Sequence, residues 1–303
     1  MSPSAVLLMA YGTPASLADV PAYYTHIRGG RPPAPEQVAH LVARYQAIGG
    51  TSPLLAITQE VAAALAARLA VPVYVGMKHW HPFIADVVAQ MHRDGVARAA
   101  AIVLAPHYSR MSVGVYLATA QEAAARCGGP ALAPVEAWHL HPGLVATLAD
   151  RVRAARAGLS ADAHVLFTAH SLPKRILAWG DPYPAQLAAS ARAVAAAAGA
   201  SRWSFAFQSA SATGEPWLGP DVLDALRDLH AAGVRDVVVC PIGFVADHLE
   251  VLYDLDVEAA ALARDLGVRL VRTASLNASP AFVDVLADLA TAALAPGRPA
   301  AHR

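Results

Sequence analysis

Three acidic residues recur at four-residue intervals after a short apolar run near residue 240. Glu250, Asp254 and Glu258 are spaced i, i+4 and i+8, so a continuous α-helix would align them on one face with a rise of roughly 6 Å per step. Like charges at this spacing destabilise a helix by about 0.2 to 0.5 kcal/mol per pair. A bound cation or proton would offset that repulsion, which makes the row a candidate for metal or proton chemistry. The simpler alternative is a solvated acidic face with Asp247 and Glu250 as a loose helix cap.

A histidine ends a second, largely apolar run. His170 follows residues 164–169 and precedes Ser171-Leu172-Pro173, which has the composition of a loop. At the end of a buried strand such a histidine is either a hydrogen-bonded structural residue or a functional one that accepts protons or binds a metal. The neighbouring Ser171 suggests a nucleophile, but the chain has no Gly-x-Ser-x-Gly elbow, so we discount a hydrolase.

Apolar runs and amphipathic segments alternate along the whole chain. We expect strands at 6–10, 73–75, 99–104, 132–136, 164–169, 203–207, 237–240 and 269–272, with helices between them. Between the last two strands we expect one continuous helix that carries the acidic row and ends near Gly267. This βα alternation predicts parallel sheets with helices on both faces.

The two halves of the chain resemble each other. Residues 6–14 align with residues 165–173, which places Tyr11 and His170 at equivalent strand ends. We therefore predict an α/β fold of two similar Rossmann-like halves, each a parallel four-stranded sheet flanked by helices, with an active-site cleft between them. The predicted parts are an N-terminal half (1–140) with a helical excursion (17–53), a C-terminal half (141–278), a C-terminal helix (279–295) packing on the N-terminal half, and a tail (296–303).

Composition narrows the class of ligand. The 303 residues are 56% apolar and contain 23 basic and 23 acidic residues, which argues against nucleic acid and against a polybasic membrane anchor. Nucleotide-binding glycine motifs are absent from the sequence, and no apolar run is long enough to span a membrane. Cys127 and Cys240 are the only cysteines, as in proteins of a reducing compartment. We expect a cytoplasmic, monomeric protein that acts on a small or medium-sized molecule.

Arginines and tyrosines are concentrated in the predicted excursion 17–53. They are Arg28, Arg31, Arg44, Tyr23, Tyr24 and Tyr45. Such residues suit a flat ligand with carboxylates, through stacking and forked hydrogen bonds, although scattered surface arginines would give the same pattern. A further pair, His79 and His81, has the i, i+2 spacing of a loop pair that can bind a metal, but we interpret these residues as incidentally exposed.

Five segments, in order along the chain, resemble the ferrochelatase family. They are residues 9–14 (MAYGTP), 23–31 (YYTHIRGGR), 44–54 (RYQAIGGTSPL), 168–173 (TAHSLP) and 243–254 (GFVADHLEVLYD). The resemblance implies a chelatase, a lyase of haem biosynthesis with the class II chelatase fold. With Tyr11, the first segment resembles that of one branch of the family. Members of this branch insert Fe(II) into coproporphyrin III to form Fe-coproporphyrin III (coprohaem). The alternatives are a protoporphyrin IX ferrochelatase, a sirohydrochlorin chelatase, or a non-catalytic haem or metal carrier.

The resemblance also implies roles for the acidic row and the histidine. His170 and Glu250 match the catalytic residues that face each other across the porphyrin and bind the metal, and Tyr11 matches a ligand of the product iron. Asp254 and Glu258 match an acidic relay that continues towards solvent. The implied substrates are Fe(II) and coproporphyrin III, and transient contact with other haem-pathway enzymes is expected.

Further residues match positions that contact the macrocycle or its propionates. They are Arg28, Arg44, Ser52 and Tyr116. Gly29 stands where relatives often have another arginine, which implies a looser propionate clamp within the porphyrin-binding excursion. Some members hold a [2Fe-2S] cluster on four cysteines, and because this chain has two, we expect no cluster and no other permanently bound cofactor.

Overall fold

The computed structural model describes residues 3–211 and 214–295, and the predicted tail 296–303 lies outside them. The chain divides into two compact units. Unit 1 comprises the residues up to Trp138 together with those from Asn277, and unit 2 comprises His139–Leu276. The sequence predicted boundaries at residues 140 and 278. Within the described ranges, no helix combines the length and the apolar composition that a membrane crossing requires.

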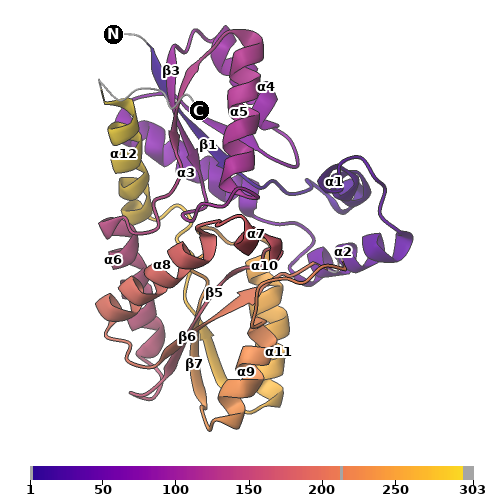
Figure 1. Cartoon of the computed structure of the whole chain (residues 1–303), viewed down its shortest axis with the longest axis vertical. Helices are drawn as coiled ribbons and strands as arrows, with labels where there is room; N and C mark the ends of the chain where they lie inside the picture. The colour runs from indigo at the N-terminus through magenta and orange to yellow at the C-terminus, as the bar shows by residue number, and fades with distance from the viewer. Residues whose placement is uncertain (1–2, 212–213, 296–303) are drawn as a thin grey trace. The chain divides into compact units, whose positions relative to one another are not determined.

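Unit 1 is built on a parallel sheet with the strand order β2-β1-β3-β4. The strands are β1 (Ser4–Ala10), β2 (Val73–Met77), β3 (Arg98–Val103) and β4 (Ala131–Val135). Helices α3 (Leu54–Leu69) and α12 (Pro280–Leu294) contact each other and one face of this sheet, and α4 (Ile84–Arg93) and α5 (Val113–Cys127) cover the other (Figure 1). The last helix of the described chain thus packs against the N-terminal sheet.

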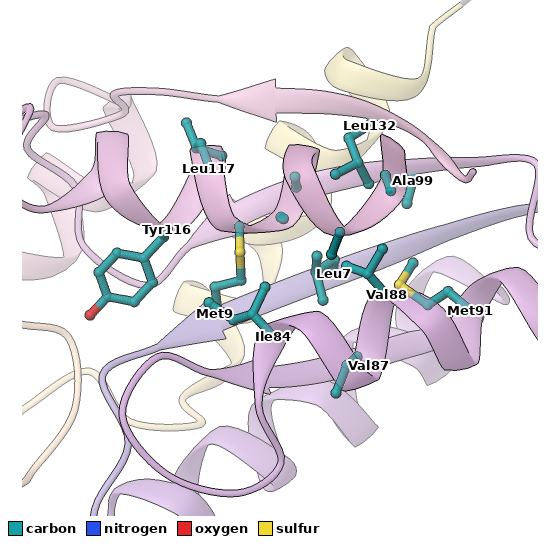
Figure 2. Close-up of a cluster of buried hydrophobic side chains, with 14 of the residues drawn as sticks. Leu7, Met9, Ile84, Val87, Val88, Met91, Ala99, Tyr116, Leu117 and Leu132 are labelled. Carbon is teal, nitrogen blue, oxygen red and sulfur yellow. The ribbon is translucent and has the colours of Figure 1, made fainter. Parts of the chain in front are cut away.

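The core between the sheet and α4 and α5 is almost entirely aliphatic. Figure 2 shows Leu7 and Met9 of β1 pointing towards Ile84, Val88 and other side chains of these helices. Burying each such side chain contributes about 1.5 to 3 kcal/mol. Residues 5–10 of β1 are all apolar and buried, which holds the strand inside unit 1 up to Ala10, where Tyr11 begins the loop.

The excursion 17–53 contains three helical segments of unit 1. They are the 3₁₀ turn η1 (Leu17–Asp19), α1 (Val20–Ile27) and α2 (Pro35–Ala47). Pro21 and Pro35 stand in the first turns of α1 and α2, where a missing backbone N–H costs no intrahelical bond. Helices α1 and α2 contact each other outside the layers that cover the sheet (Figure 1).

Unit 2 repeats the topology of unit 1, with the strand order β6-β5-β7-β8. The strands are β5 (His164–His170), β6 (Trp203–Gln208), β7 (Asp236–Cys240) and β8 (Arg269–Arg272). Helices α6 (Pro142–Arg156) and α8 (Tyr183–Ala198) cover one face, and α9 (Val222–Ala231) and α11 (Ala260–Asp265) cover the other. The short α7 (Arg175–Ala178) follows β5. All the strands predicted from the sequence form, and the predicted parallel α/β fold is confirmed.

The helix that carries the acidic row differs from the prediction. It begins as α10 (Leu249–Leu252), continues as the π-helix η2 (Asp254–Ala259) and becomes α-helical again in α11. The amide of Glu258 donates to the carbonyl of Tyr253 at 2.9 Å, a bond that spans five residues instead of four. The predicted ideal α-spacing is therefore wrong after Asp254, because the wider π turn changes the direction in which each acidic side chain points.

Candidate active site

Two histidines flank one carboxylate in unit 2. Nε2 of His170, the last residue of β5, lies 3.4 Å from Oε1 of Glu250 on α10. Nε2 of His248 lies 3.6 Å from Oε2 of the same carboxylate. The side chains of His170 and Glu250 are 30% and 27% exposed, so a ligand can reach them. The predicted pair is thus brought together, with a third group that the sequence analysis did not select.

Backbone carbonyls set the orientation of both imidazole rings. Nδ1 of His170 contacts the carbonyl oxygen of Ser171, and Nδ1 of His248 contacts that of Ala246 at 2.9 Å. A carbonyl oxygen can only accept, so Nδ1 carries the proton in each ring. The Nε2 atoms, which face Glu250, are therefore the atoms that can take up a proton or bind a metal.

Opposite charges determine the proton affinities of this pair. Burial alone would lower the pKa of His170, but the Glu250 carboxylate, the Ser171 carbonyl and Asp254 outweigh it and raise the pKa to about 9. Burial alone would raise the pKa of Glu250, but His170 and His248 hold it well below its usual range. The two histidines therefore determine the proton affinity of Glu250.

A glycine brings the loop after β7 against β5. The amide of Gly243 donates to the carbonyl of Thr168 at 3.2 Å. A Cβ atom at Gly243 would lie 2.5 Å from Cβ of Ala169, closer than real side chains approach. The loop that leads to Glu250 can therefore contact the strand that carries His170 only because residue 243 lacks a side chain.

The other members of the acidic row have different surroundings. Asp254 is 5% exposed and accepts a hydrogen bond from Ser209, whereas Glu258 is exposed. Along the row, Glu250 is thus partly buried, Asp254 is buried and Glu258 is in contact with solvent. Among the residues that the structure describes, no three His, Cys, Asp or Glu side chains form a closed metal-binding set.

An arginine braces the segments on both sides of Glu250. The guanidinium of Arg272 binds both carboxylate oxygens of Asp256 at 2.7 and 2.9 Å and lies 3.2 Å from Asp247. The hydroxyl of Ser275 donates to Asp247 at 2.6 Å. The end of β8 is thereby fastened to the loop before Glu250 and to η2 after it.

Packing around His170 restricts its ring. The carbonyl of His170 accepts a hydrogen bond from the Tyr183 hydroxyl at 2.9 Å, and the ring of Trp217 lies 6.3 Å from the imidazole, centroid to centroid. The hydroxyl of Ser171 donates to the carbonyl of Leu218 at 2.8 Å. Ser171 is thus occupied in holding the loop, in agreement with the decision to discount a nucleophilic serine.

In unit 1, Tyr11 follows β1 and is 40% exposed. Its ring lies 4.6 Å from that of His79, centroid to centroid. Gly12 has φ +94°, and a Cβ there would lie 2.9 Å from the amide nitrogen of Trp80, so only glycine allows this turn. His79 is half-buried and its Nδ1 lies 3.2 Å from that of His26, whereas His81 is exposed as expected. Burial, with Lys78 and His26 nearby, lowers the pKa of His79 to about 3.

The predicted arginines of unit 1 are partly buried: Arg28 directly follows α1 as its C-cap, and Arg44 lies on α2. The guanidinium of Arg28 lies 5.9 Å from the centroid of the Tyr24 ring. Nε of Arg28 is buried and has no hydrogen-bond partner in the described part of the chain. Arg44 lies in the last turn of α2. A buried guanidinium donor without a protein partner suits a ligand carboxylate.

Ser52 and Tyr116, the other predicted macrocycle contacts, also belong to unit 1. The Ser52 hydroxyl accepts the amide of Leu54 at 3.3 Å and so supports the start of α3. Tyr116 is 6% exposed, and Nζ of Lys78 lies 5.1 Å from its ring centroid. Figure 2 shows Tyr116 at one end of the aliphatic cluster, with its hydroxyl pointing away from the other labelled side chains.

Comparison with known proteins assigns the chain to a family. Residues 3–294 match the family described as Ferrochelatase. The chain belongs to the ferrochelatase family. Membership identifies it as a metal chelatase, as the motifs around His170 and Glu250 predicted. The family match covers both units.

Relatives in the ferrochelatase family align over nearly their whole length. A ferrochelatase from Herpetosiphon aurantiacus is 47% identical, over 95% of this chain and 98% of that protein. The coproporphyrin III ferrochelatase of Anoxybacillus flavithermus is 48% identical, over 94% of both chains. That of Bacillus subtilis is 46% identical, over 94% of this chain and 96% of its own.

Solved structures place the fold among the class II chelatases. The sirohydrochlorin chelatase SirB from Bacillus subtilis subspecies spizizenii, in complex with cobalt, has a TM-score of 0.61 at 12% identity, covering 96% of this chain and 95% of that chain. CbiX, the terminal enzyme for siroheme biosynthesis in denitrifying bacteria, has a TM-score of 0.54 at 18% identity, covering 96% of this chain and 99% of its own. At these identities the likeness concerns the fold alone.

Proposed function

We propose that this chain inserts Fe(II) into coproporphyrin III to form Fe-coproporphyrin III, a lyase reaction of haem biosynthesis. The observation that carries the proposal is the His170–Glu250 pair, in which a ring nitrogen and a carboxylate oxygen lie 3.4 Å apart. The choice of porphyrin rests on the coproporphyrin III ferrochelatases among the relatives.

Metallation must remove two protons from the pyrrole nitrogens while one Fe²⁺ ion enters the ring. Nε2 of His170 and the Glu250 carboxylate are the proposed proton acceptors, since Nδ1 of His170 is occupied by the Ser171 carbonyl. A proton that His170 holds in the resting pair has to leave before the ring nitrogen can accept another or bind iron. Glu250 balances the charge at each stage, so the site alternates between holding protons and holding metal.

The acidic row supplies a proposed route for the ions. Asp254 lies buried next in line after Glu250, and Glu258 is exposed. Oxygen ligands bind hydrated Fe(II) weakly enough to release it, and a histidine nitrogen is a stronger ligand for it. Iron would therefore pass from carboxylates to the His170–Glu250 pair, and protons would leave in the opposite direction.

Residues of unit 1 are the proposed contacts of the macrocycle. Coproporphyrin III carries more propionates than protoporphyrin IX, and the buried Nε of Arg28 is an available donor for one of them. Arg44, Ser52 and Tyr116 are proposed to contact the macrocycle or its propionates as well. Tyr11, exposed after the Gly12 turn, is the proposed oxygen ligand of the product iron. Holding a distorted ring by its periphery would present the nitrogen lone pairs to the metal.

Further expectations concern cysteines and location. Cys240 is buried at the end of β7, and burial raises the pKa of its thiol to about 12. Cys127 on α5 donates to the Gly129 carbonyl at 2.9 Å. We propose that neither holds a [2Fe-2S] cluster and that the protein is cytoplasmic, where both thiols stay reduced. Iron analysis of the purified chain tests the first point.

An anaerobic absorbance assay tests the activity. Purified protein receives Fe(II) together with coproporphyrin III, protoporphyrin IX or sirohydrochlorin in parallel, and loss of the free-base bands is followed. We expect turnover of coproporphyrin III at least ten times faster than that of the others. A preference for protoporphyrin IX or sirohydrochlorin would overturn the proposed substrate, and binding without metallation would favour a haem or metal carrier.

A further inference from the structure

A buried hydrogen-bond chain links β5 to the backbone of Glu250 within unit 2. The hydroxyl of Thr168 donates to Oε1 of Gln208, the last residue of β6, at 2.9 Å. Nε2 of Gln208 donates to the backbone carbonyl of Glu250 at 2.7 Å. Thr168 and Gln208 are both 0% exposed, so the bond between them is buried, and the bond from Gln208 to Glu250 is partly buried.

The acceptor at the end of this chain fixes the Gln208 amide in one orientation. The Glu250 carbonyl can only accept, so the amide nitrogen has to face it, and the amide oxygen is left to accept from Thr168. Reversing the amide would place two acceptors against each other. A buried polar group that loses its partner is destabilising, and the chain therefore holds Glu250 at a set position relative to β5.

Gln208 also contacts the strand end that carries His170. His170 and Gln208 are paired in the parallel register of β5 and β6, and the carbonyl of Gln208 accepts the amide of Ser171 at 2.8 Å. One residue thus bonds through its backbone to the neighbour of His170 and through its side chain to Glu250. It connects the two chain segments whose side chains form the His170–Glu250 pair.

The next residue contacts the second carboxylate of the acidic row. Ser209 has φ +62°, a left-handed conformation that costs a non-glycine residue about 1 kcal/mol or more. In this conformation its hydroxyl donates to the carboxylate of Asp254. A strained serine at a position where glycine would be easier points to a requirement for the hydroxyl.

We propose that Thr168, Gln208 and Ser209 form a positioning relay that sets Glu250 and Asp254 relative to His170 for metal binding. None of the three binds the metal or the porphyrin in this proposal. They act through the residues that do, and the inference rests on the proposed role of His170 and Glu250 as metal ligands. Outer groups that orient ligands in this way typically change metal affinity or activity by about 10- to 100-fold when removed.

The test uses near-isosteric variants of the full chain. Thr168→Val and Gln208→Met remove the side-chain hydrogen bonds of these residues while keeping a similar side-chain volume. Thr168→Ser keeps the hydroxyl at position 168. Ser209→Gly removes the hydroxyl that bonds to Asp254 and relieves the left-handed backbone. Ser204→Ala is the matched control, because the Ser204 hydroxyl bonds to Nε2 of His164 at 2.8 Å across the other end of the same strand pair. Ala70→Gly controls for relief of a left-handed residue, with φ 54° at the end of α3.

Two readouts separate positioning from general stability. The first is the affinity for Zn²⁺ titrated into the protein without porphyrin, and the second is the pair of KM values for Fe(II) and for coproporphyrin III. For Thr168→Val, Gln208→Met and Ser209→Gly we expect Zn²⁺ affinity to fall by about 10-fold or more and KM for Fe(II) to rise by a similar factor. KM for the porphyrin stays within about twofold, Thr168→Ser returns to near wild type, and both controls leave all values unchanged.

Other outcomes overturn the relay. Unchanged Zn²⁺ affinity in Ser209→Gly and Gln208→Met would remove the positioning role, as would equal losses in Ser204→Ala. Ser209→Gly keeps the test decisive even where a core variant fails to fold, since glycine suits its backbone. A wild-type protein that binds Zn²⁺ but metallates no porphyrin would refute the proposed function. The Zn²⁺ affinities of wild type and variants would then still test the positioning relay.

Discussion

Nε2 of His170 lies 3.4 Å from Oε1 of Glu250, although β5 and α10 are far apart in the sequence. Glu250 raises the pKa of His170 and His170 lowers that of Glu250, so the charged forms of the two side chains stabilise each other. A divalent metal needs the same two atoms with the proton on Nε2 of His170 removed. Metal uptake by this pair is therefore expected to release a proton. His170 contributes a ring nitrogen to this exchange, and Glu250 contributes a negative charge.

Removing either partner tests those contributions. We expect His170→Ala to lower the rate of metallation by at least about 10²-fold, because a proton acceptor and a metal ligand are lost together. Glu250→Gln should slow metallation strongly while leaving porphyrin binding within a few-fold, measured by quenching of tryptophan fluorescence. Near wild-type metallation by a folded His170→Ala protein would contradict the mechanism, as would a Glu250→Gln protein with normal turnover and weak porphyrin binding.

The same pair predicts how stability depends on pH. The pKa of His170 is raised from 6.5 to about 9, so its contribution is complete below about pH 6.5 and is lost as the pH rises through 9. The pKa of Glu250 is lowered from 4.5, so its contribution is present above pH 4.5 and is lost at lower pH. The stabilisation by the pair is therefore greatest between about pH 4.5 and 6.5.

Urea unfolding of wild type and Glu250→Gln at pH 6 and pH 9.5 measures this effect. The free energy of unfolding of the wild type should exceed that of the variant at pH 6, and this difference should decrease at pH 9.5. Asp162→Asn is the control, because it breaks an exposed ion pair with Arg202 at 2.9 Å that involves neither His170 nor Glu250. A difference that stays constant or grows with pH would refute the pairing.

Local patterns were sufficient to predict the strands and the position of His170. A parallel strand buried on both faces is a continuous apolar run, as in β5 and β7, and the residue after such a run lies at the ligand-binding edge of an α/β sheet. The acidic residues after Gly243 were conspicuous for their spacing alone. The strands and the candidate residues His170 and Glu250 were therefore selected from features of short segments, and the family resemblance implied that the two residues act together.

Contacts between segments that are distant in the sequence could not be predicted from such local patterns. The π turn at η2 depends on how Tyr253 and Glu258 bond within a packed helix, and no periodicity distinguishes it from an α-helix. Gln208 has no local signal for its bond to Glu250, since the two residues meet only through the sheet. His248 did carry a signal, its i, i+2 spacing from Glu250, which became meaningful once its ring orientation was known.

Gly243→Ala tests the close approach of the loop to β5. A methyl group would have to displace Ala169 or the loop, and we expect a loss of about 1 to 3 kcal/mol in the free energy of unfolding. Because the loop leads to Glu250, metallation should fall more than stability alone explains. Gly158→Ala is the matched control, since its Cβ meets no atom within 4 Å and should leave both quantities unchanged. Equal effects of the two substitutions, measured by urea unfolding and metallation rate, would contradict this account.

Arg272 provides the last test, because its fork holds two acidic residues on either side of Glu250. Arg272→Lys keeps the charge but cannot bind both oxygens of Asp256 and reach Asp247 as well. We expect an increase in KM for Fe(II) and a loss of stability of about 1 kcal/mol, because the forked hydrogen bonds to Asp256 are lost. Arg227→Lys is the control, since the exposed pair of Arg227 with Asp224 at 2.8 Å contributes little. If Arg272→Lys reduced stability without changing KM for Fe(II), the arginine would serve the fold of unit 2 and not the position of Glu250.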